Sequence, residues 1–542
     1  MGGMVDSTGF CAPSTGNIVK GNALHWFRHG LRLHDNPALN HAVCRCVEGS
    51  SASGRLFCLF VVDRSRFELP RDEAHNVRMS AARHRFLHDC LRDLDDSLRQ
   101  RGSRLIVALG DPVKVIPQLL TEWRIGVLTY EKDVAPYSME RDALVNKFAM
   151  EQGVEVYVQH SKTLYDLDML KDKSGGRIPL TYNGFQKLTA QAGRVAKPVA
   201  LPEGPIPGPD ENLISEEHKQ WIDTNEYVAN TPLLFPGGET EALKRLETSL
   251  SDPKWVANFE KPKTSPNSLD PSTTVLSPYL AMGCLSPKVF WHRLADIYAR
   301  HPKHSVPPVS LHGQLLFREY FHAVGYTTDN FGRMEGNAIC KQIPWDRNDE
   351  LLDAWEYSRT GYPFIDAIMA QLRMEGWIHH LARHAVACFL TRGDLWQSWE
   401  QGASVFEKYL LDGDWSLNIS NWLWLSSSAF FYQYFRVYSP ISFGKKTDPN
   451  GDYIRKYLPV LKNMPHKYIY EPWTAPKEVQ MRAGCVIGKD YPMPIVDHAV
   501  ASKQNMQKMK VAYEIQANRI SSNSKKKGNS KSGDPPIKRR RL

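Results

Sequence analysis

The feature of this sequence that most constrains its fold is a change of pattern along the chain. Residues 23–160 alternate short apolar runs of strand type with helical segments, whereas strand patterns largely vanish from residue 237 onward. Strands separated by helices pair in parallel, and the helices then cover the faces of the sheet. A chain of 542 residues is also too long for one hydrophobic core. The sequence therefore predicts an α/β N-terminal domain with a doubly wound parallel sheet, followed by a large all-helical C-terminal domain.

The spacing of apolar residues also predicts the individual strands and helices. The strands are expected at Ala23–Phe27, Leu56–Val62, Leu105–Ala108, Val127–Thr129 and Val154–Val158, with helices near Ala74–Gln100, Pro112–Trp123 and Ser138–Gln152. Later helices are expected at Glu239–Leu250, Lys288–Arg300, Leu311–Ala323, Leu351–Trp355, Pro363–Met374, Trp377–Leu390 and Leu395–Leu411. Many of these are apolar nearly all round, which suits helices buried in a bundle. No G-x-G-x-x-G follows the first strand, so a plain dinucleotide site is not predicted.

The sequence predicts that the chain has five parts. We expect a flexible N-terminus over residues 1–22, the α/β domain over 23–160 and a connector over 161–236, where Pro and Gly are dense and periodicity is weak. The helical domain is expected over 237–515, and a disordered basic tail over 516–542, because the end of the chain is rich in Lys, Ser and Gly and has almost no apolar content.

The net charge of +9 is concentrated in the last residues of the chain. Residues 521–542 hold eight basic side chains against one aspartate, so the rest of the chain is nearly neutral. Bulk charge is therefore no argument that the folded part binds nucleic acid, and a local basic patch would have to do so. Residues 535–541, Pro-Pro-Ile-Lys-Arg-Arg-Arg, are typical of a nuclear import sequence, which predicts a location in the nucleus.

Cysteine usage and hydropathy indicate the compartment. The nine cysteines are scattered, odd in number and contain no C-x-x-C pair, which favours free thiols in a reducing compartment. No apolar run reaches membrane-spanning length, and residues 1–22 lack the basic start and apolar block of a signal peptide. We expect a soluble protein with no membrane contact, and a monomer.

Chemistry-bearing residues crowd into residues 376–424. Three histidines, two arginines and six tryptophans lie there among Leu, Ala, Val and Phe, and polar groups in such a setting need a ligand or a network. His380 and His384 share a helix face, with Arg383 on the neighbouring ridge. A zinc-protease motif is excluded because Leu381 stands where the glutamate is needed, so no metal is predicted. Taken singly these histidines could be inert core residues.

Two further segments point to one large cofactor. Residues 271–279 are a run of hydroxyls before a helix start, a composition that suits phosphate binding. Gln314 and Arg318 are four apart and share a face of the next helix, and Asp412 and Asp414 flank a glycine. Together with the histidine helix, these groups could surround a partly anionic, polar-rimmed cofactor.

The motifs jointly resemble those of the cryptochrome/photolyase family along nearly the whole chain. Residues 25–39 are similar to the opening motif of that family, and residues 273–277, 376–384 and 412–424 are similar to its flavin-binding segments. The similarity is strongest to the branch that contains (6-4) photolyases and animal-type cryptochromes. It implies an α/β antenna domain, a connector and a helical domain that holds FAD. A second antenna chromophore, a deazaflavin or a folate, is left open.

The resemblance implies roles for individual residues. The residues implied at FAD are Thr273, Thr274, Val275, Leu276, Ser277, Gln314, Arg318, His380, Arg383, Asp412, Gly413, Asp414 and Asn418, with Arg383 and Asp412 as an ion pair over the flavin. The tryptophans implied in electron transfer are Trp422, Trp399, Trp345 and Trp396. The residues implied at a DNA lesion are His380 and His384 as catalytic groups, and Lys261, Gln314, Phe317 and Tyr438 as binding groups.

The resemblance implies light-driven repair of (6-4) pyrimidine photoproducts in nuclear DNA, with electron transfer from reduced FAD and proton donation by a histidine. The main alternative is a cryptochrome, a photoreceptor or regulator that binds clock or transcription proteins, and one protein could combine both roles. Tyr438 and Asn421 favour repair, whereas Phe317 stands where the family commonly has tryptophan and favours the alternative. Repair of cyclobutane dimers is disfavoured because that branch commonly has Asn at the position of His380.

Overall fold

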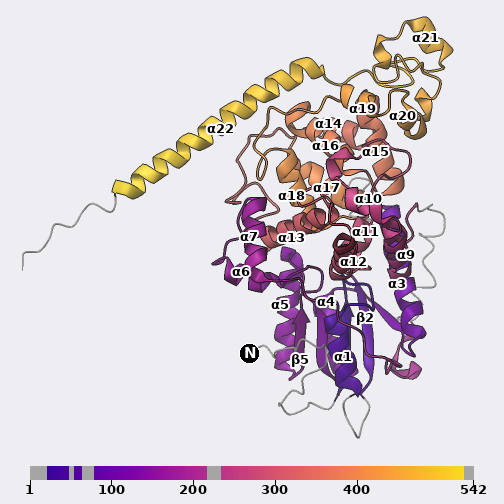
Figure 1. Ribbon diagram of the computed structural model, residues 1–542, viewed down its shortest axis with the longest axis vertical. Coiled ribbons are helices and arrows are strands. Elements are labelled where there is room, and N and C mark those ends of the chain that lie inside the picture. Colours follow the sequence, from indigo (N-terminus) through magenta and orange to yellow (C-terminus); the bar gives the residue numbers. More distant parts are fainter. Residues whose placement is uncertain (1–20, 48–53, 64–78, 217–233, 530–542) are drawn as a thin grey trace, which may run out of the picture. The chain divides into compact units, whose positions relative to one another are not determined.

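The computed structural model describes residues 21–47, 54–63, 79–216 and 234–529 (Figure 1). The chain divides into two compact units. Unit 1 comprises Met1–Thr328, Ala367–Ala382 and Ala403–Ser420, and unit 2 comprises Asp329–Asp366, Arg383–Gly402 and Asn421–Leu542. Among the described helices, none combines the length and the apolar character that crossing a membrane requires.

A five-stranded parallel sheet forms the centre of the α/β domain in unit 1. Its strands are β1 (Asn22–Phe27), β2 (Leu56–Val62), β3 (Leu105–Leu109), β4 (Ile125–Glu131) and β5 (Glu155–Gln159), in the order β3-β2-β1-β4-β5. The register pairs His25 with Cys58 of β2 and with Thr129 of β4. The reversal of strand order at β1 and β4 is that of a doubly wound fold, and the predicted fold class is confirmed.

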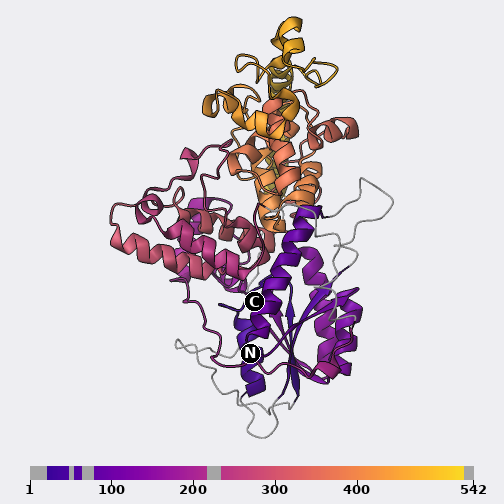
Figure 2. The same cartoon turned by 90° about the vertical axis from the view of Figure 1, so that its right-hand side faces the viewer.

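Helices cover both faces of this sheet (Figures 1 and 2). Helices α1 (Pro37–Val47) and α3 (Ala81–Arg99) pack on the face that carries Ala23 and Phe27, whereas α4 (Pro112–Glu122) and α5 (Pro136–Glu151) pack on the face that carries Leu24 and Trp26. The two faces separate because successive side chains of a strand point in opposite directions. Helix α1 was missed by the sequence prediction, which placed no helix between the first two strands.

The connector is more regular than predicted. It contains helices α6 (Leu167–Lys173) and α7 (Tyr182–Ala192) and the 3₁₀ turn η1 (Glu211–Leu213), which corrects the expectation of an irregular segment. Local capping explains both helices. The carboxylate of Asp166 accepts hydrogen bonds from the amides of Asp168 and Met169, and the hydroxyl of Thr181 accepts one from Gly184.

The rest of the described chain is helical. Its helices are α9 (Glu239–Leu250), α10 (Pro253–Asn258), α11 (Ser277–Met282), α12 (Pro287–Arg300), α13 (Leu311–Thr327), α14 (Asp349–Glu356), α15 (Pro363–Glu375), α16 (His380–Cys388), α17 (Trp399–Tyr409), α18 (Trp415–Leu425), α19 (Ser442–Thr447), α20 (Asp452–Tyr457), α21 (Lys477–Arg482) and α22 (His498–Asn529). Helix α9 has the predicted bounds.

Two of the predicted helices are interrupted where the tryptophans lie. The helix expected over Trp377–Leu390 ends at Cys388 in a single wide turn, Phe389–Gly393, and the helix expected over Leu395–Leu411 begins only at Trp399. The segment between them cannot be helical because Trp396 has a left-handed φ of +55°. The hydroxyl of Ser398 then accepts a hydrogen bond from the amide of Glu400 at the start of α17.

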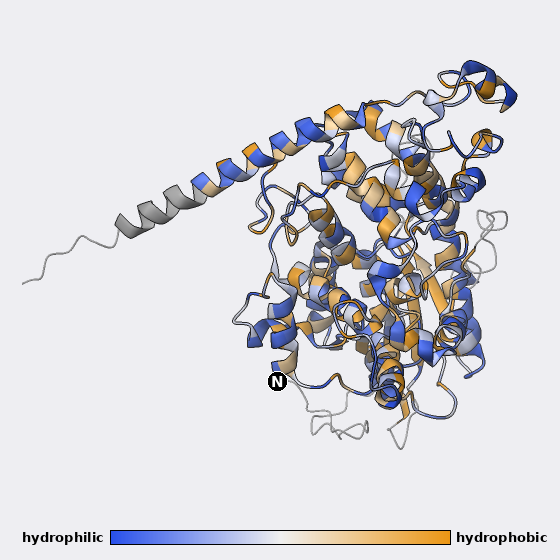
Figure 3. Cartoon of the chain, turned by 45° about the horizontal axis from the view of Figure 1, so that its top comes forward, coloured by the Kyte–Doolittle hydropathy of each residue, from blue (hydrophilic) through white to orange (hydrophobic). Residues whose placement is uncertain are grey.

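The predicted disorder from residue 516 onward is wrong as far as Asn529, since these residues continue α22 (Figure 1). The physical reason is that extending an existing helix is much less costly than nucleating one. Beyond its first turns, the coloured part of α22 carries mostly hydrophilic colours (Figure 3). Residues 535–541, the predicted import sequence, lie outside the described residues, as do residues 1–20.

Candidate functional site

The predicted phosphate-binding run forms a strained turn in unit 1. Val275 has a φ of +50°, which is unfavourable for a β-branched residue, and Leu276 follows with a right-handed φ of −91° and ψ of −6°. Such a change of hand makes successive backbone amides converge, as they do in anion-binding nests. Within the described residues the buried Oγ of Ser272 has no hydrogen-bond partner. Thr273 and Thr274 are half-buried. The run therefore fits a phosphate-bearing ligand.

This turn is tied to the α/β domain. A side chain at Gly283, just after α11, would lie 2.1 Å from the backbone nitrogen of Gly30, which follows β1. The amide of Gly30 donates to the carbonyl oxygen of Met282 over 3.0 Å. Gly283 also has a φ of +71°, so both space and backbone conformation require glycine there. The contact places the end of α11, the helix that follows the hydroxyl run, against the segment after β1.

Arg318 and Asp414 lie in one buried network of unit 1. The guanidinium of Arg318 donates from Nη1 to the carbonyl of Lys162 (2.6 Å) and from Nη2 to that of Leu280 (3.2 Å). Oδ2 of Asp414 lies 2.5 Å from Nζ of Lys162 and 3.2 Å from Nε2 of His322, and Oδ1 accepts from the amide of Leu417. Asp414 thus starts α18 and carries a charge that Lys162 neutralises.

The electrostatics of this network follow from burial and from its cations. Burial opposes ionisation of Asp414, yet His322, Lys162 and Arg318 together hold the pKa of its carboxyl well below the usual range. Burial lowers the pKa of the Arg318 guanidinium, although nearby Asp414 and Glu319 favour the charged form. Lys162 and His322 were missed by the sequence prediction. Their pairing with Asp414 depends on segments far apart in the chain, so no local pattern indicated it.

The other predicted cofactor residues are divided between the units. His380, Asp412, Gly413 and Asn418 belong to unit 1 and Arg383 belongs to unit 2, so the ion pair predicted between Arg383 and Asp412 stays a prediction. Nδ2 of Asn418 donates to the carbonyl of Ala403 over 2.8 Å, which leaves its Oδ1 for another donor.

Two of the predicted lesion-binding residues also lie in unit 1. Nε2 of Gln314 donates to the carbonyl of Pro308 over 3.0 Å. Lys261 begins the 3₁₀ turn η3 (Lys261–Lys263).

In unit 2 the predicted proton donor contacts the predicted lesion-binding tyrosine. Nδ1 of His384 lies 3.1 Å from Oη of Tyr438, and the two rings meet edge to face with centroids 5.8 Å apart. Both side chains are half-buried. Burial, with the nearby Cys388 thiol, raises the pKa of Tyr438, so this phenol stays protonated at neutral pH. The imidazole of His384 is therefore oriented through Nδ1. In unit 1 the rings of His379 and His380 lie 4.4 Å apart.

The predicted electron-transfer tryptophans all lie in unit 2. Trp422, Trp399 and Trp396 are buried, and Trp345 is half-buried with its ring centroid 4.6 Å from that of Trp396. Gly402 lies one helical turn beyond Trp399, and a Cβ there would lie 2.2 Å from Cη2 of Trp422. A glycine at this position lets the Trp422 ring pack directly on α17.

Phe317 stacks on a residue of the connector. Its ring lies 4.2 Å from that of Tyr182, at an interplanar angle of 18°, and Tyr182 begins α7. The sequence prediction treated Phe317 alone as the lesion-stacking residue. Tyr182 lies in the connector, which was expected to be irregular, so its stacking on Phe317 could not be inferred from the sequence.

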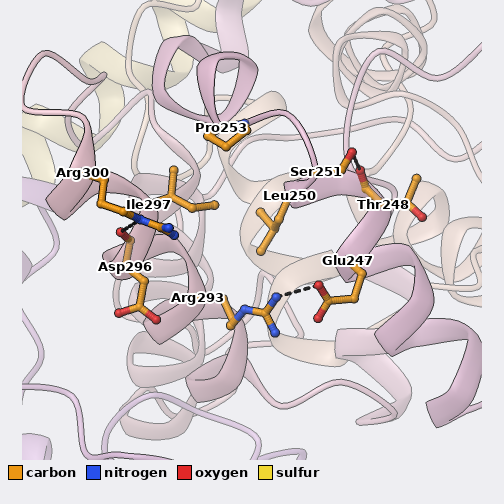
Figure 4. A pocket seen from close by; sticks show the side chains of 9 residues that line it. All are labelled: Glu247, Thr248, Leu250, Ser251, Pro253, Arg293, Asp296, Ile297 and Arg300. Atoms are coloured by element: carbon orange, nitrogen blue, oxygen red, sulfur yellow. Dashed lines mark hydrogen bonds and ion pairs between the residues drawn. The ribbon is translucent and has the colours of Figure 1, made fainter.

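Two other features of unit 1 lie apart from these residues. A surface pocket of about 570 Å³ is lined by α9, α10 and α12 and contains an ion pair of 2.6 Å between Arg293 and Glu247 (Figure 4). It includes none of the predicted site residues. Among the described residues, a trio that includes His160 and Asp168 has the spacing of metal ligands, but Nζ of Lys132 already lies 2.5 Å from Asp168.

Comparison with known proteins places these features in a family. Residues 23–205 match the family model described as DNA photolyase, and residues 310–511 match the FAD binding domain of DNA photolyase. The chain is 50% identical over 520 residues to a (6-4)DNA photolyase of Oryza sativa subsp. japonica, covering 94% of this chain and 92% of that protein. It is also 50% identical over 500 residues to Cryptochrome-1 of Rattus norvegicus, covering 91% of this chain and 83% of that protein.

Solved structures agree with this assignment. A class III photolyase from Agrobacterium tumefaciens matches with a TM-score of 0.74 at 27% identity, over 93% of this chain and 100% of that one. A cryptochrome from Synechocystis sp. PCC6803 matches with a TM-score of 0.75 at 25% identity, over 90% of this chain and 99% of that one. The FAD-binding match, together with the strained hydroxyl turn, supports FAD as the cofactor. The chain belongs to the cryptochrome/photolyase family, in the branch that contains (6-4) photolyases and animal cryptochromes.

Proposed function

We propose that this protein is a (6-4) DNA photolyase, which uses light to repair (6-4) pyrimidine photoproducts in nuclear DNA. The observation that carries the proposal is the contact between Nδ1 of His384 and Oη of Tyr438, because it holds the histidine ring by Nδ1. The other ring nitrogen, Nε2, would then be the proton donor. The similarity to the rice (6-4)DNA photolyase over almost the whole of both chains supports the same assignment.

The chain's residues have distinct parts in this reaction. Reduced FAD, excited by light, supplies the electron that the lesion receives. The turn at Val275 would hold the phosphates, and Asn418 and Asp412 would line the flavin. The lesion must be flipped out of the duplex, as for other enzymes that act on bases, and Phe317 would stack on it with support from Tyr182. Lys261 and Gln314 would hold the flipped nucleotides, beside His380.

Proton transfer is assigned to His384. An imidazole suits this step because its pKa lies near the working pH, so a charged ring can give up a proton as negative charge arrives on the lesion. The phenol of Tyr438 fixes the ring orientation, which keeps Nε2 directed to one place. A second antenna chromophore, a deazaflavin or a folate, would bind to the α/β domain and add light collection.

A second candidate function is that of a cryptochrome, a light receptor or regulator that binds clock or transcription proteins. The identity to Cryptochrome-1 of Rattus norvegicus equals that to the rice photolyase. Phe317 also stands where the family commonly has tryptophan. The histidine pair and the aspartates occur in both branches, so repair activity itself must separate the two functions.

The decisive experiment uses the purified, FAD-loaded protein after chemical reduction. An oligonucleotide with one (6-4) photoproduct is added and illuminated with blue or near-ultraviolet light, and restored thymines are measured by chromatography. A photolyase restores them in light and not in darkness, and His384→Ala with full FAD content does not. No restoration by protein whose FAD is bound and photoreducible would instead favour the cryptochrome function.

A further inference from the structure

The C-terminal helix α22 lies against two of the predicted electron-transfer tryptophans of unit 2, Trp345 and Trp396. Met509 and Ala512 of α22 are buried with Trp396 and Ile343 in one apolar cluster, against which Trp345 packs. Nζ of Lys508, also on α22, lies 4.9 Å from the centroid of the Trp396 ring. A cation therefore sits over the face of one of the two tryptophans.

Both partners of this contact, α22 and the Trp396 ring, are held in place by hydrogen bonds. At the start of α22, Nδ1 of His498 lies 2.6 Å from Oδ1 of Asp394, and Nδ2 of Asn505 donates to the carbonyl of Asp394 over 3.0 Å. Asp394 lies two residues before Trp396, so α22 is attached to the same segment that carries the tryptophan. The indole Nε1 of Trp396 donates to the carbonyl of Pro344 over 2.9 Å, which fixes the ring plane.

The two tryptophans have different surroundings. Trp396 is 3% exposed and lies under the Lys508 ammonium, whereas Trp345 is half-buried, and in the described part of the chain no lysine or arginine lies over its ring. A cation attracts the electron-rich face of a neutral indole but repels an indole that has lost an electron. The Lys508 charge thus acts most directly against oxidation of Trp396.

The ammonium of Lys508 is only partly shielded from water, which limits the size of this effect. Its side chain is 48% exposed, and Oδ2 of Asp346 lies 4.0 Å from Nζ and offsets part of its charge. Solvent and this carboxylate screen the repulsion without cancelling it. The effect should therefore be moderate and should weaken as the salt concentration rises.

A neighbouring tyrosine of α22 does not take over from the tryptophans. Oxidation of a tyrosine requires its phenolic proton to leave, yet Oη of Tyr513 donates to the carbonyl of Ser427 over 2.6 Å, and a carbonyl is a poor base. Nζ of Lys341 also lies 4.3 Å from the Tyr513 ring, and burial raises the pKa of this phenol.

We propose that Lys508 is a positioning residue for charge. Its charge disfavours oxidation of Trp396, so the tryptophan radical cation stays on Trp345. This inference rests on the proposed electron-transfer role of the tryptophans. In that role Trp422 gives one electron to light-excited oxidised FAD and recovers one from Trp399, which recovers one from Trp345. No covalent bond changes, and an added thiol such as dithiothreitol finally returns one electron to Trp345.

The test is transient absorption of the tryptophan radical in the FAD-loaded protein after a laser flash. In Lys508→Met the radical cation can also form on Trp396. The radical should then live about three times longer than in the wild type, since a radical cation farther from the reduced flavin recombines with it more slowly. Lys508→Arg keeps the charge and should match the wild type. Lys510→Met, on the same helix but paired with Glu514, is the control and should also match it.

Two further variants separate charge from packing. Asp346→Asn removes the offsetting charge at an exposed position and strengthens the effect of Lys508 on Trp396, so the radical should stay on Trp345 and its lifetime should not lengthen, unlike in Lys508→Met. Trp396→Phe should leave the radical lifetime of the otherwise wild-type protein almost unchanged. Combined with Lys508→Met, it should abolish the longer lifetime of that variant. Amide hydrogen exchange of α22 in darkness reports whether the helix stays docked in each variant.

The outcomes distinguish this inference from the electron-transfer proposal on which it rests. Radicals that form normally but have the same lifetime in Lys508→Met, with α22 docked, would overturn the role of Lys508 alone. The same holds if a longer lifetime in Lys508→Met persists when Trp396 is also replaced by phenylalanine, because the radical would then not have reached Trp396. A wild-type protein that binds FAD and forms no tryptophan radical would overturn both proposals.

Discussion

The ammonium of Lys162 lies 2.5 Å from Oδ2 of Asp414, and both side chains are buried in unit 1. Lys162 follows β5 closely, and its carbonyl oxygen also accepts a hydrogen bond from Arg318. One residue at the carboxyl end of the sheet therefore holds two residues implied at the flavin. The α/β domain thus supports the proposed cofactor site in addition to any role in collecting light.

Replacing Lys162 should weaken FAD binding. Lys162→Met leaves the Asp414 carboxylate buried without its closest cation, and breaking such a pair costs about 3–5 kcal/mol. We expect a lower thermal midpoint and FAD affinity reduced by at least about tenfold, with Lys162→Arg partly restoring both. Lys132→Met, which removes a partly exposed ion pair with Asp168, is the control. Unchanged FAD affinity in Lys162→Met would show that this pair supports the fold alone.

Tyr438 should control the efficiency of His384 as an acid. Tyr438→Phe removes the hydroxyl that lies 3.1 Å from Nδ1, so the ring can rotate and Nε2 loses its fixed direction. Repair by the pre-reduced enzyme should fall about 10-fold, and in His384→Ala about 10²–10⁴-fold, the usual contribution of a general acid. The quantum yield of repair across pH 6–9 measures both effects. Equal repair by Tyr438→Phe and wild type would contradict the orienting role.

Trp399 should be required to photoreduce FAD but not to repair DNA. Trp399→Phe replaces an oxidisable indole on α17 by a ring that is far harder to oxidise, while burial is largely kept. Photoreduction of oxidised FAD, followed by absorbance under blue light with dithiothreitol, should be nearly lost. Repair by chemically reduced protein should stay within about twofold of the wild type, because that electron does not pass through Trp399. Normal photoreduction would remove Trp399 from the chain of donors.

Gly402→Ala should displace Trp422. Replacing a glycine inside a helix by alanine ordinarily stabilises the protein by about 0.5–1 kcal/mol. Here the added Cβ would lie 2.2 Å from Cη2 of Trp422, and overpacking costs about 1–3 kcal/mol, so the clash should exceed the gain. Thermal denaturation should show a net loss of stability, and photoreduction should slow because Trp422 moves. A stabilised variant with normal photoreduction would show that α17 yields to the methyl group.

Acid should destabilise the α/β domain through His25. Burial, with some repulsion from Arg28, lowers the pKa of this imidazole to about 3 from its usual 6.5. The unfolded chain then binds more protons, so the contribution of His25 is complete above pH 6.5 and is lost as the pH falls from 6.5 toward 3. At pH 5 the loss is about 2 kcal/mol. Urea unfolding at pH 7 and pH 5 should show a smaller change in His25→Gln, and an equal change in both proteins would contradict this assignment.

Much of the fold could be predicted because its determinants are local. The alternation of strands and helices over residues 23–160 indicated the parallel sheet, and the helical spacing of Glu239–Leu250 indicated α9 with its bounds. Where prediction failed, a single residue overrode the local pattern. Trp396 interrupts an apparently helical run because its backbone is left-handed, and Asp166 and Thr181 cap two helices in a segment that lacks clear periodicity.

By itself, the sequence determined the fold class and the family motifs, because both depend on residue spacing along short stretches of chain. Only the tertiary structure decided which side chains meet. His384 and Tyr438 are separated by 54 positions, and Lys162 reaches Asp414 from the end of a strand. Such contacts depend on how helices and strands pack, and so do the strained turn at Val275 and the position of Lys508 over Trp396. Packing is a sum over many distant residues, which no local pattern records.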